Sequence, residues 1–149
     1  MKEEYYTPET SELFIGYILE YRSKSYISVE KIEWHLWTKI TVNTDFLARG
    51  CSESSFDSDV EIRTKYLTKE DIESEGWSFQ YQELLAVDEY NHRFFSKGRH
   101  FLEYLIEGDI IIIKIKAQTT KGREPLLIYL GSCPSINEFR KICKWLNIK

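Results

Sequence analysis

Apolar and polar residues alternate along several short stretches of the chain, a pattern that is typical of half-buried β-strands. The clearest stretch covers residues 60–67, where Ile62 and Thr64 fall on one face and charged residues fall on the other. Residues 22–25 are expected to form a turn. Further strands are predicted at residues 13–21, at two places within 26–42, and at 77–81, 100–106, 110–116 and 126–130.

Two helices are predicted from capping residues and helical spacing. Thr68, followed three residues later by Asp71, predicts the start of a short middle helix, which Gly76 ends. Near the C-terminus, Ser135 and Glu138 form a capping box. The apolar residues that follow at helical spacing are Ile136, Phe139, Ile142, Cys143 and Leu146. The predicted fold class is α+β: a mainly antiparallel β-sheet with a short middle helix and a C-terminal helix packed on one face.

The length and composition predict one folded domain. A chain of 149 residues is long enough to bury its own hydrophobic core. Hydrophobic residues make up 42% and charged residues 30%, which excludes wholesale disorder. Because the chain holds only 3 Pro and 7 Gly, we expect no long flexible linker. A single domain over residues 1–149 is therefore expected.

Charge and cysteine content limit the partners and the compartment. The chain has 20 Lys and Arg against 24 Asp and Glu, whereas a general nucleic-acid-binding surface is basic. The acidic, polar opening predicts no signal peptide, and the longest apolar run, residues 110–113, is too short to span a membrane. Cys51, Cys133 and Cys143 are widely spaced and are expected to be reduced thiols. We therefore expect a cytoplasmic protein with no membrane partner and no general nucleic-acid binding.

Two stretches resemble one group of proteins. The first is the opening Tyr-Tyr-Thr-Pro-Glu at residues 5–9, which precedes an apolar strand containing Gly16. The second is Lys-Tyr-Leu-Thr-Lys-Glu-Asp-Ile-Glu-Ser-Glu-Gly-Trp at residues 65–77. Together with the strand-then-helix layout of the C-terminus, they resemble small uncharacterised proteins of Bacteroidetes and their phages or prophages. The resemblance implies a mobile-element setting, with the host cytoplasm as the location, and it implies no activity or site residues.

The sequence carries no recognisable catalytic, phosphate-binding or metal-binding motif. It contains neither a Gly-x-Ser-x-Gly elbow nor a Gly-Lys-Ser/Thr phosphate loop. A zinc site made by Cys133, Cys143 and one histidine would need three distant segments to converge. We therefore expect no metal, no cofactor and no enzymatic activity. The alternative, an enzyme of unrecognised type, would draw its residues from Asp88, His92 and His100.

Aromatic residues are abundant, with 4 Trp, 10 Tyr and 8 Phe. Large rings fill cores, and they also anchor interfaces because they bury much area with few rotatable bonds. Between residues 93 and 101, cations interleave with rings, an arrangement that suits an anionic partner or a nucleotide. The candidate partner-binding residues are Arg93, Phe94, Phe95, Lys97, Arg99, Trp34, Trp37 and Trp77.

These observations favour a non-enzymatic, phage-encoded or prophage-encoded interaction protein with an unknown protein partner. The binding element would be an aromatic-rich sheet face or the long polar loop predicted at residues 43–59, since loops of that length often carry function. One alternative is a nucleotide-binding sponge or anti-defence protein, which rests on the interleaved cations and rings. Another is a virion or assembly component, which would form stable oligomers.

Overall fold

The chain folds into two compact units, which meet in sequence between Lys65 and Tyr66. The structure, a computed structural model, describes residues 4–28, 31–50, 60–84, 91–108 and 110–149. The single domain expected over residues 1–149 stays a prediction.

The N-terminal unit is built on an antiparallel sheet whose longest strand is β2 (Ile18–Ser28). In the described part of the chain its strand order is β1-β5-β2-β3, with β4 also paired to β2. The other elements are β1 (Tyr5–Tyr6), the 3-10 helix η1 (Thr10–Glu12), β3 (Lys31–Trp34), β4 (Thr38–Thr41), α1 (Thr44–Gly50) and β5 (Val60–Lys65). One face of this sheet is buried around Tyr17, Leu19, Val42 and Ile62.

Two sequence expectations about β2 are wrong. The strand begins at Ile18 rather than at residue 13, because the chain turns at Gly16, whose φ of 94° suits glycine. Residues 22–25, expected as a turn, continue the strand. They are held there by pairing on both sides: Arg22 lies opposite Glu61 of β5, and Lys24 lies opposite Trp34 of β3. This pairing between distant segments outweighs the local turn preference of the serines.

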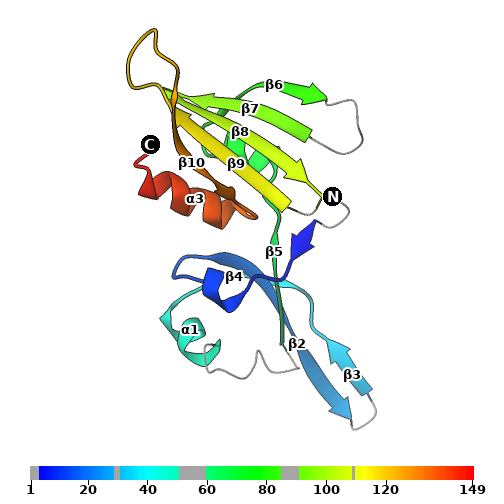
Figure 1. The fold of residues 1–149 in the computed structure, drawn as a ribbon. Helices are drawn as coiled ribbons and strands as arrows, with labels where there is room; N and C mark the ends of the chain where they lie inside the picture. The colour runs from blue at the N-terminus through cyan, green and yellow to red at the C-terminus, as the bar shows by residue number, and fades with distance from the viewer. Residues whose placement is uncertain (1–3, 29–30, 51–59, 85–90, 109) are drawn as a thin grey trace. The chain divides into compact units, whose positions relative to one another are not determined.

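The C-terminal unit holds a second antiparallel sheet and two helices (Figure 1). Its strands follow one another in space as in sequence, β6-β7-β8-β9-β10. The elements are α2 (Lys69–Ser74), β6 (Ser78–Leu84), β7 (Asn91–Lys97), β8 (His100–Glu107), β9 (Ile110–Ala117), β10 (Leu126–Ser132) and α3 (Ile136–Trp145). The predicted α+β class, with a short middle helix and a C-terminal helix, is confirmed, although the strands divide between two sheets.

The helix starts agree with the capping residues. The Asp71 amide donates to Thr68 Oγ1 at 3.2 Å, and the Thr68 amide donates back to Asp71 Oδ2 at 3.0 Å, so the middle helix has a complete capping box. At α3, the Glu138 amide donates to Ser135 Oγ at 3.4 Å. Gly76 has a φ of 82° just after α2, where a side chain would be strained.

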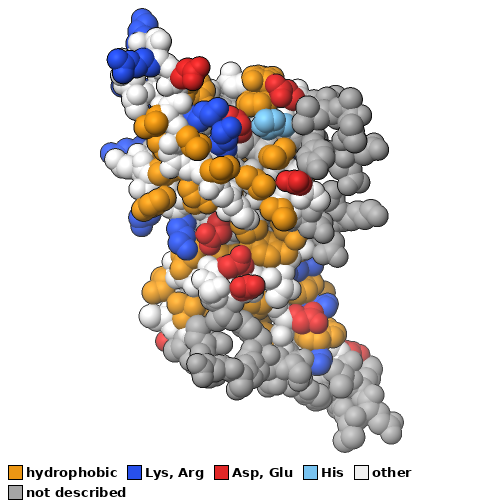
Figure 2. Space-filling model, in the orientation of Figure 1, with side chains coloured by type: hydrophobic (Ala, Val, Ile, Leu, Met, Phe, Trp, Pro, Cys, Tyr) orange, Lys and Arg blue, Asp and Glu red, His pale blue; other side chains and the backbone are white. Residues whose placement is uncertain are grey.

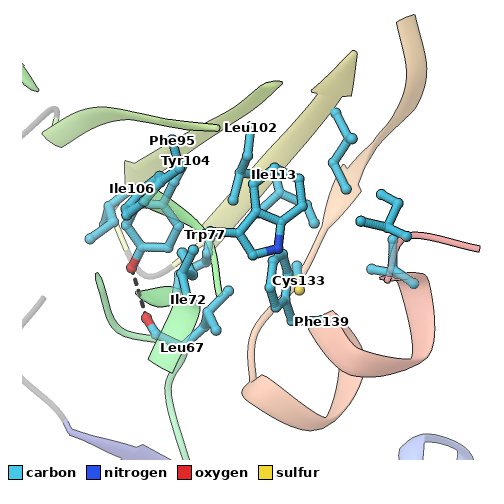
Figure 3. Packing of buried hydrophobic residues seen from close by; sticks show 14 residues of the cluster. Leu67, Ile72, Trp77, Phe95, Leu102, Tyr104, Ile106, Ile113, Cys133 and Phe139 are labelled. Atoms are coloured by element: carbon cyan, nitrogen blue, oxygen red, sulfur yellow. Dashed lines mark hydrogen bonds between the residues drawn. The ribbon is translucent and has the colours of Figure 1, made fainter. Parts of the chain in front are cut away.

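Helices α2 and α3 pack on the same face of the β6–β10 sheet (Figure 3). Ile72 of α2 and Phe139 of α3 join a buried cluster with strand residues such as Leu102 and Ile113. At its centre the fully buried Tyr104 hydroxyl donates a hydrogen bond of 2.7 Å to the Leu67 backbone carbonyl. This bond joins strand β8 to the segment that leads into α2.

None of the helices in the described part of the chain has the length and apolar character that a membrane-spanning helix needs.

We expect Tyr104→Phe to lower the free energy of unfolding by about 1–3 kcal/mol, because the Leu67 carbonyl stays buried and loses its donor. Urea denaturation at neutral pH measures the difference. Tyr129→Phe is the matched control, since the Tyr129 hydroxyl makes an exposed bond of 3.3 Å to the Ser132 carbonyl. Equal stabilities of the two variants would contradict a structural role for the buried bond.

The same tyrosine predicts a loss of stability at alkaline pH. Burial raises the pKa of Tyr104 to about 12, from its usual value of 10.0. The folded state therefore holds the proton where the unfolded chain has released it, and the associated stability is lost as the pH rises from 10 through about 12. Urea denaturation at several alkaline pH values should show a smaller decline for Tyr104→Phe than for the parent protein.

Candidate partner-binding face

The strand pleat divides the C-terminal sheet into a helix-covered face and an open face. Successive residues of a strand point to opposite sides, so the register assigns each side chain to one face. On β8 and β9 the buried residues alternate with partly or fully exposed ones. The open face includes Tyr81, Glu83, His92, Phe94, Phe101, Glu103, Leu105, Glu107, Ile110, Ile112, Lys114, Lys116, Leu127 and Leu130.

Large hydrophobic side chains are exposed on this open face. Tyr81 is 52% exposed, Phe101 40%, Ile110 56%, Leu127 46% and Leu130 61%. Figure 2 shows hydrophobic side chains gathered over this unit, with lysine, glutamate and histidine between them. Monomeric soluble proteins rarely expose a large contiguous apolar patch, and those that do commonly use it for binding. The open face is therefore the strongest candidate for a functional surface in the described part of the chain.

A β-bulge brings two aromatic rings together on the open face. In a regular strand Tyr81 would share a face with Phe79, which packs against the buried cluster. The register shifts between these two residues, so that Tyr81 lies opposite Phe94 instead. Their rings stack with centroids 4.3 Å apart and an interplanar angle of 17°. The sequence pattern placed Phe79 and Tyr81 on one face, and the bulge separates them.

Glu103 is the electrostatic centre of the open face. Its carboxylate lies 2.7 Å from Lys116 Nζ, 3.1 Å from Lys114 Nζ and 3.6 Å from His92 Nε2. Burial alone would raise the pKa of Glu103, but hydrogen bonds from the two lysines outweigh it and hold the pKa below the usual value of 4.5. The hydrogen bond to Glu103 also raises the pKa of Lys116. Two lysines therefore share one carboxylate at the centre of the face.

The residues predicted between 93 and 101 are not brought together. Arg93, Phe95 and Lys97 lie on the helix-covered side, where Phe95 is buried and Lys97 Nζ donates to the Glu75 carbonyl at the end of α2. Arg93 lies 5.9 Å from the centroid of the Tyr104 ring. Phe94 points to the opposite, open face. Because the pleat places neighbouring residues on opposite sides of a sheet, one small ligand cannot contact all of them.

The remaining predicted residues lie in three other places. Trp77 is buried against Phe139 in the core, with ring centroids 6.0 Å apart, so it is not a surface residue. Arg99 is exposed in the turn between β7 and β8. Trp34 and Trp37 belong to the N-terminal unit.

In the N-terminal unit, aromatic rings and arginines contact one another on one sheet face. The Arg63 guanidinium lies 3.9 Å from the Tyr5 ring centroid and 4.0 Å from that of Trp37. Arg22 lies 4.6 Å from the Trp37 centroid and 4.8 Å from that of Trp34. These distances fit cation–π interactions.

Carboxylates pair with both of these arginines. Arg63 Nε donates to Glu20 at 2.8 Å, and Arg22 Nε donates to Glu61 at 2.7 Å, in each case across a strand pair. A nucleotide would have to displace these contacts to stack on the rings or to bind the guanidinium groups. The cluster therefore stabilises the sheet and holds Trp37 against it.

The described residues include two of the three candidates for catalysis, His92 and His100. Asp88 and Cys51 lie outside them, His100 begins β8, and His92 lies on the open face between Glu83 and Glu103. Burial raises the pKa of the Cys143 thiol to about 11 and that of Cys133 well above its usual value, which disfavours the reactive thiolate. The described part of the chain contains no group of three or more His, Cys, Asp or Glu residues placed to hold a metal ion.

The sequence patterns do not predict most of the open face. One sequence pattern bears on it: residues 110–113 are apolar at both phases of their strand, which predicts that both faces of this strand are covered there. That prediction is wrong at Ile110, which is 56% exposed. No local sequence pattern predicts the stacking of Tyr81 on Phe94, because this contact depends on the bulge between Phe79 and Tyr81.

We expect Glu103→Gln to destabilise the protein at neutral pH, because Lys114 and Lys116 lose the carboxylate that they share. A lowered carboxyl pKa contributes stability above the unfolded-state pKa, and this contribution is lost as the pH falls through the folded-state pKa. The difference between Glu103→Gln and the parent protein should therefore shrink as the pH falls below 4.5. Glu107→Gln, a change at the exposed end of the same strand, is the control for urea denaturation at both pH values.

Comparison with known proteins adds no assignment to these observations. No protein-family model matches the chain, and neither the curated proteins nor the solved structures contain a match.

Proposed function

We propose that the protein is a non-enzymatic interaction protein that binds another protein through the open face of its C-terminal sheet. The observation that carries the proposal is the set of exposed hydrophobic side chains on that face, from Phe101 and Leu127 at one end to Ile110 at the other. Removing such side chains from water is the main driving force for protein association.

The composition of the open face resembles that of protein interfaces more than that of small-ligand sites. Aromatic and aliphatic side chains are mixed with a lysine–glutamate–histidine network in which Glu103 pairs with two lysines. Interfaces of this kind combine apolar anchors with polar groups that set orientation. The face is a sheet surface rather than a deep cavity, and a partner that covers it needs a matching extended surface.

The nucleotide-binding alternative has weaker support. Its residues are divided between the two faces of β7, and the tryptophans of the N-terminal unit already contact arginines that are paired with carboxylates. The segment 43–59, which the sequence predicts as a polar loop, contains helix α1 (Thr44–Gly50), and residues 51–59 lie outside the described residues. The proposed binding surface does not include this segment. The mobile-element setting and the cytoplasmic location belong to the proposal as expectations from the sequence.

The test compares two leucine-to-aspartate variants. Leu130 is 61% exposed on the open face, whereas Leu36 is 89% exposed in the N-terminal unit. Each protein is immobilised and incubated with a lysate of cells that express the natural protein, and the retained proteins are quantified by mass spectrometry. We expect Leu130→Asp to lose at least about 90% of a partner that the parent and Leu36→Asp retain, because a buried unpaired carboxylate strongly opposes association.

Thermal denaturation of each variant establishes that it is folded before capture. Identical sets of retained proteins for Leu130→Asp and the parent would contradict the proposal. Loss of the partner in both variants would place the binding surface away from the open face and would contradict it equally.

A further inference from the structure

The two ends of the open face carry opposite charge. Arg99 lies in the turn just before β8, and Lys121 and Arg123 lie in the loop between β9 and β10, where they outnumber the one acidic residue of that loop, Glu124. At the other end, β8 finishes at Glu107, and Glu83 lies near the same end on β6. Both Arg99 and Glu107 are exposed. The apolar side chains lie between these ends.

This polarity restricts how two copies of the face can pack together. Two sheets that pack face to face are related by a twofold axis in the plane between them. An axis parallel to the strands would place each basic end on the basic end of the other copy. An axis across the strands places each basic end on an acidic end. Only this arrangement pairs opposite charges, and the twofold symmetry makes the pairing occur at both ends of the interface.

We infer that the partner of the open face is a second copy of this chain, bound with antiparallel strands about a twofold axis across them. The inference rests on the proposed function and names its partner. In this dimer the start of β8 lies over the end of β8 in the other copy. Arg99 of each copy faces Glu107 of the other, and Phe101 lies over the end of the face that carries Ile110.

The size of the face suits a dimer that forms and dissociates. Five strands about 4.8 Å apart and about 3.3 Å per residue give a face of roughly 600 Å² in each copy. Two copies would bury roughly 1,200 Å², at the lower end of the range for stable, specific interfaces. The dimer is therefore expected to depend on protein concentration.

Sedimentation equilibrium over a concentration series measures the dissociation constant of the parent and five variants, one of which is Leu130→Asp. The charge reversals Arg99→Glu and Glu107→Lys should each weaken the dimer by at least about tenfold, because each creates two like-charge contacts across the twofold axis. The double variant, Arg99→Glu with Glu107→Lys, exchanges the charges and should restore the parent value within about threefold. Lys144→Glu, an exposed charge reversal on α3, is the matched control and should leave the constant unchanged.

The outcomes distinguish this inference from the proposed function. A monomer at every concentration overturns the inference, and the proposed function still stands if Leu130→Asp loses another protein that the parent retains. A dimer that Leu130→Asp disrupts, but that the single charge reversals leave intact, supports the proposed function and overturns the antiparallel arrangement. A dimer that none of these variants affects lies elsewhere and overturns the inference.

Discussion

Helices α2 and α3 cover one face of the β6–β10 sheet and leave the opposite face open, and the other features of this unit follow from that arrangement. The covered face holds Leu102, Ile113 and the buried Tyr104–Leu67 hydrogen bond, which joins the sheet to the start of α2. A twisted sheet of this width cannot bury both faces with two short helices on one side.

The two units use their aromatic residues differently. In the N-terminal unit, Trp37 contacts Arg22 and Arg63, and both arginines are paired with glutamates across strands. Those rings stabilise the sheet by local contacts. In the C-terminal unit, Trp77 fills the core, whereas Tyr81 stacks on Phe94 with half of its surface exposed. A high content of aromatic residues therefore does not by itself predict a binding surface. The place of each ring in the fold decides whether it fills the core, stabilises a sheet or is exposed for binding.

The sequence predicted the fold class and most elements, but little of the candidate site. Alternation along residues 60–67 and the Thr68–Asp71 capping box depend on neighbours in the chain, and the structure contains both β5 and the capped helix α2. Residues 22–25 were misassigned because their conformation depends on pairing with two distant strands. The interleaved cations and rings at 93–101 are close in sequence, but the pleat places Arg93 and Phe94 on opposite faces.

The spacing of side chains over a few residues determined most of the strands, the two helix caps and the α+β class, because each of these depends on neighbours in the chain. The tertiary structure decided which apolar residues are buried and which remain exposed. Ile111 and Ile110 are adjacent and chemically identical, but Ile111 is 1% exposed and Ile110 is 56% exposed. The difference comes from the helices that pack against one side of the sheet, and these lie far from both residues in sequence. For the same reason, only the tertiary structure revealed the open face.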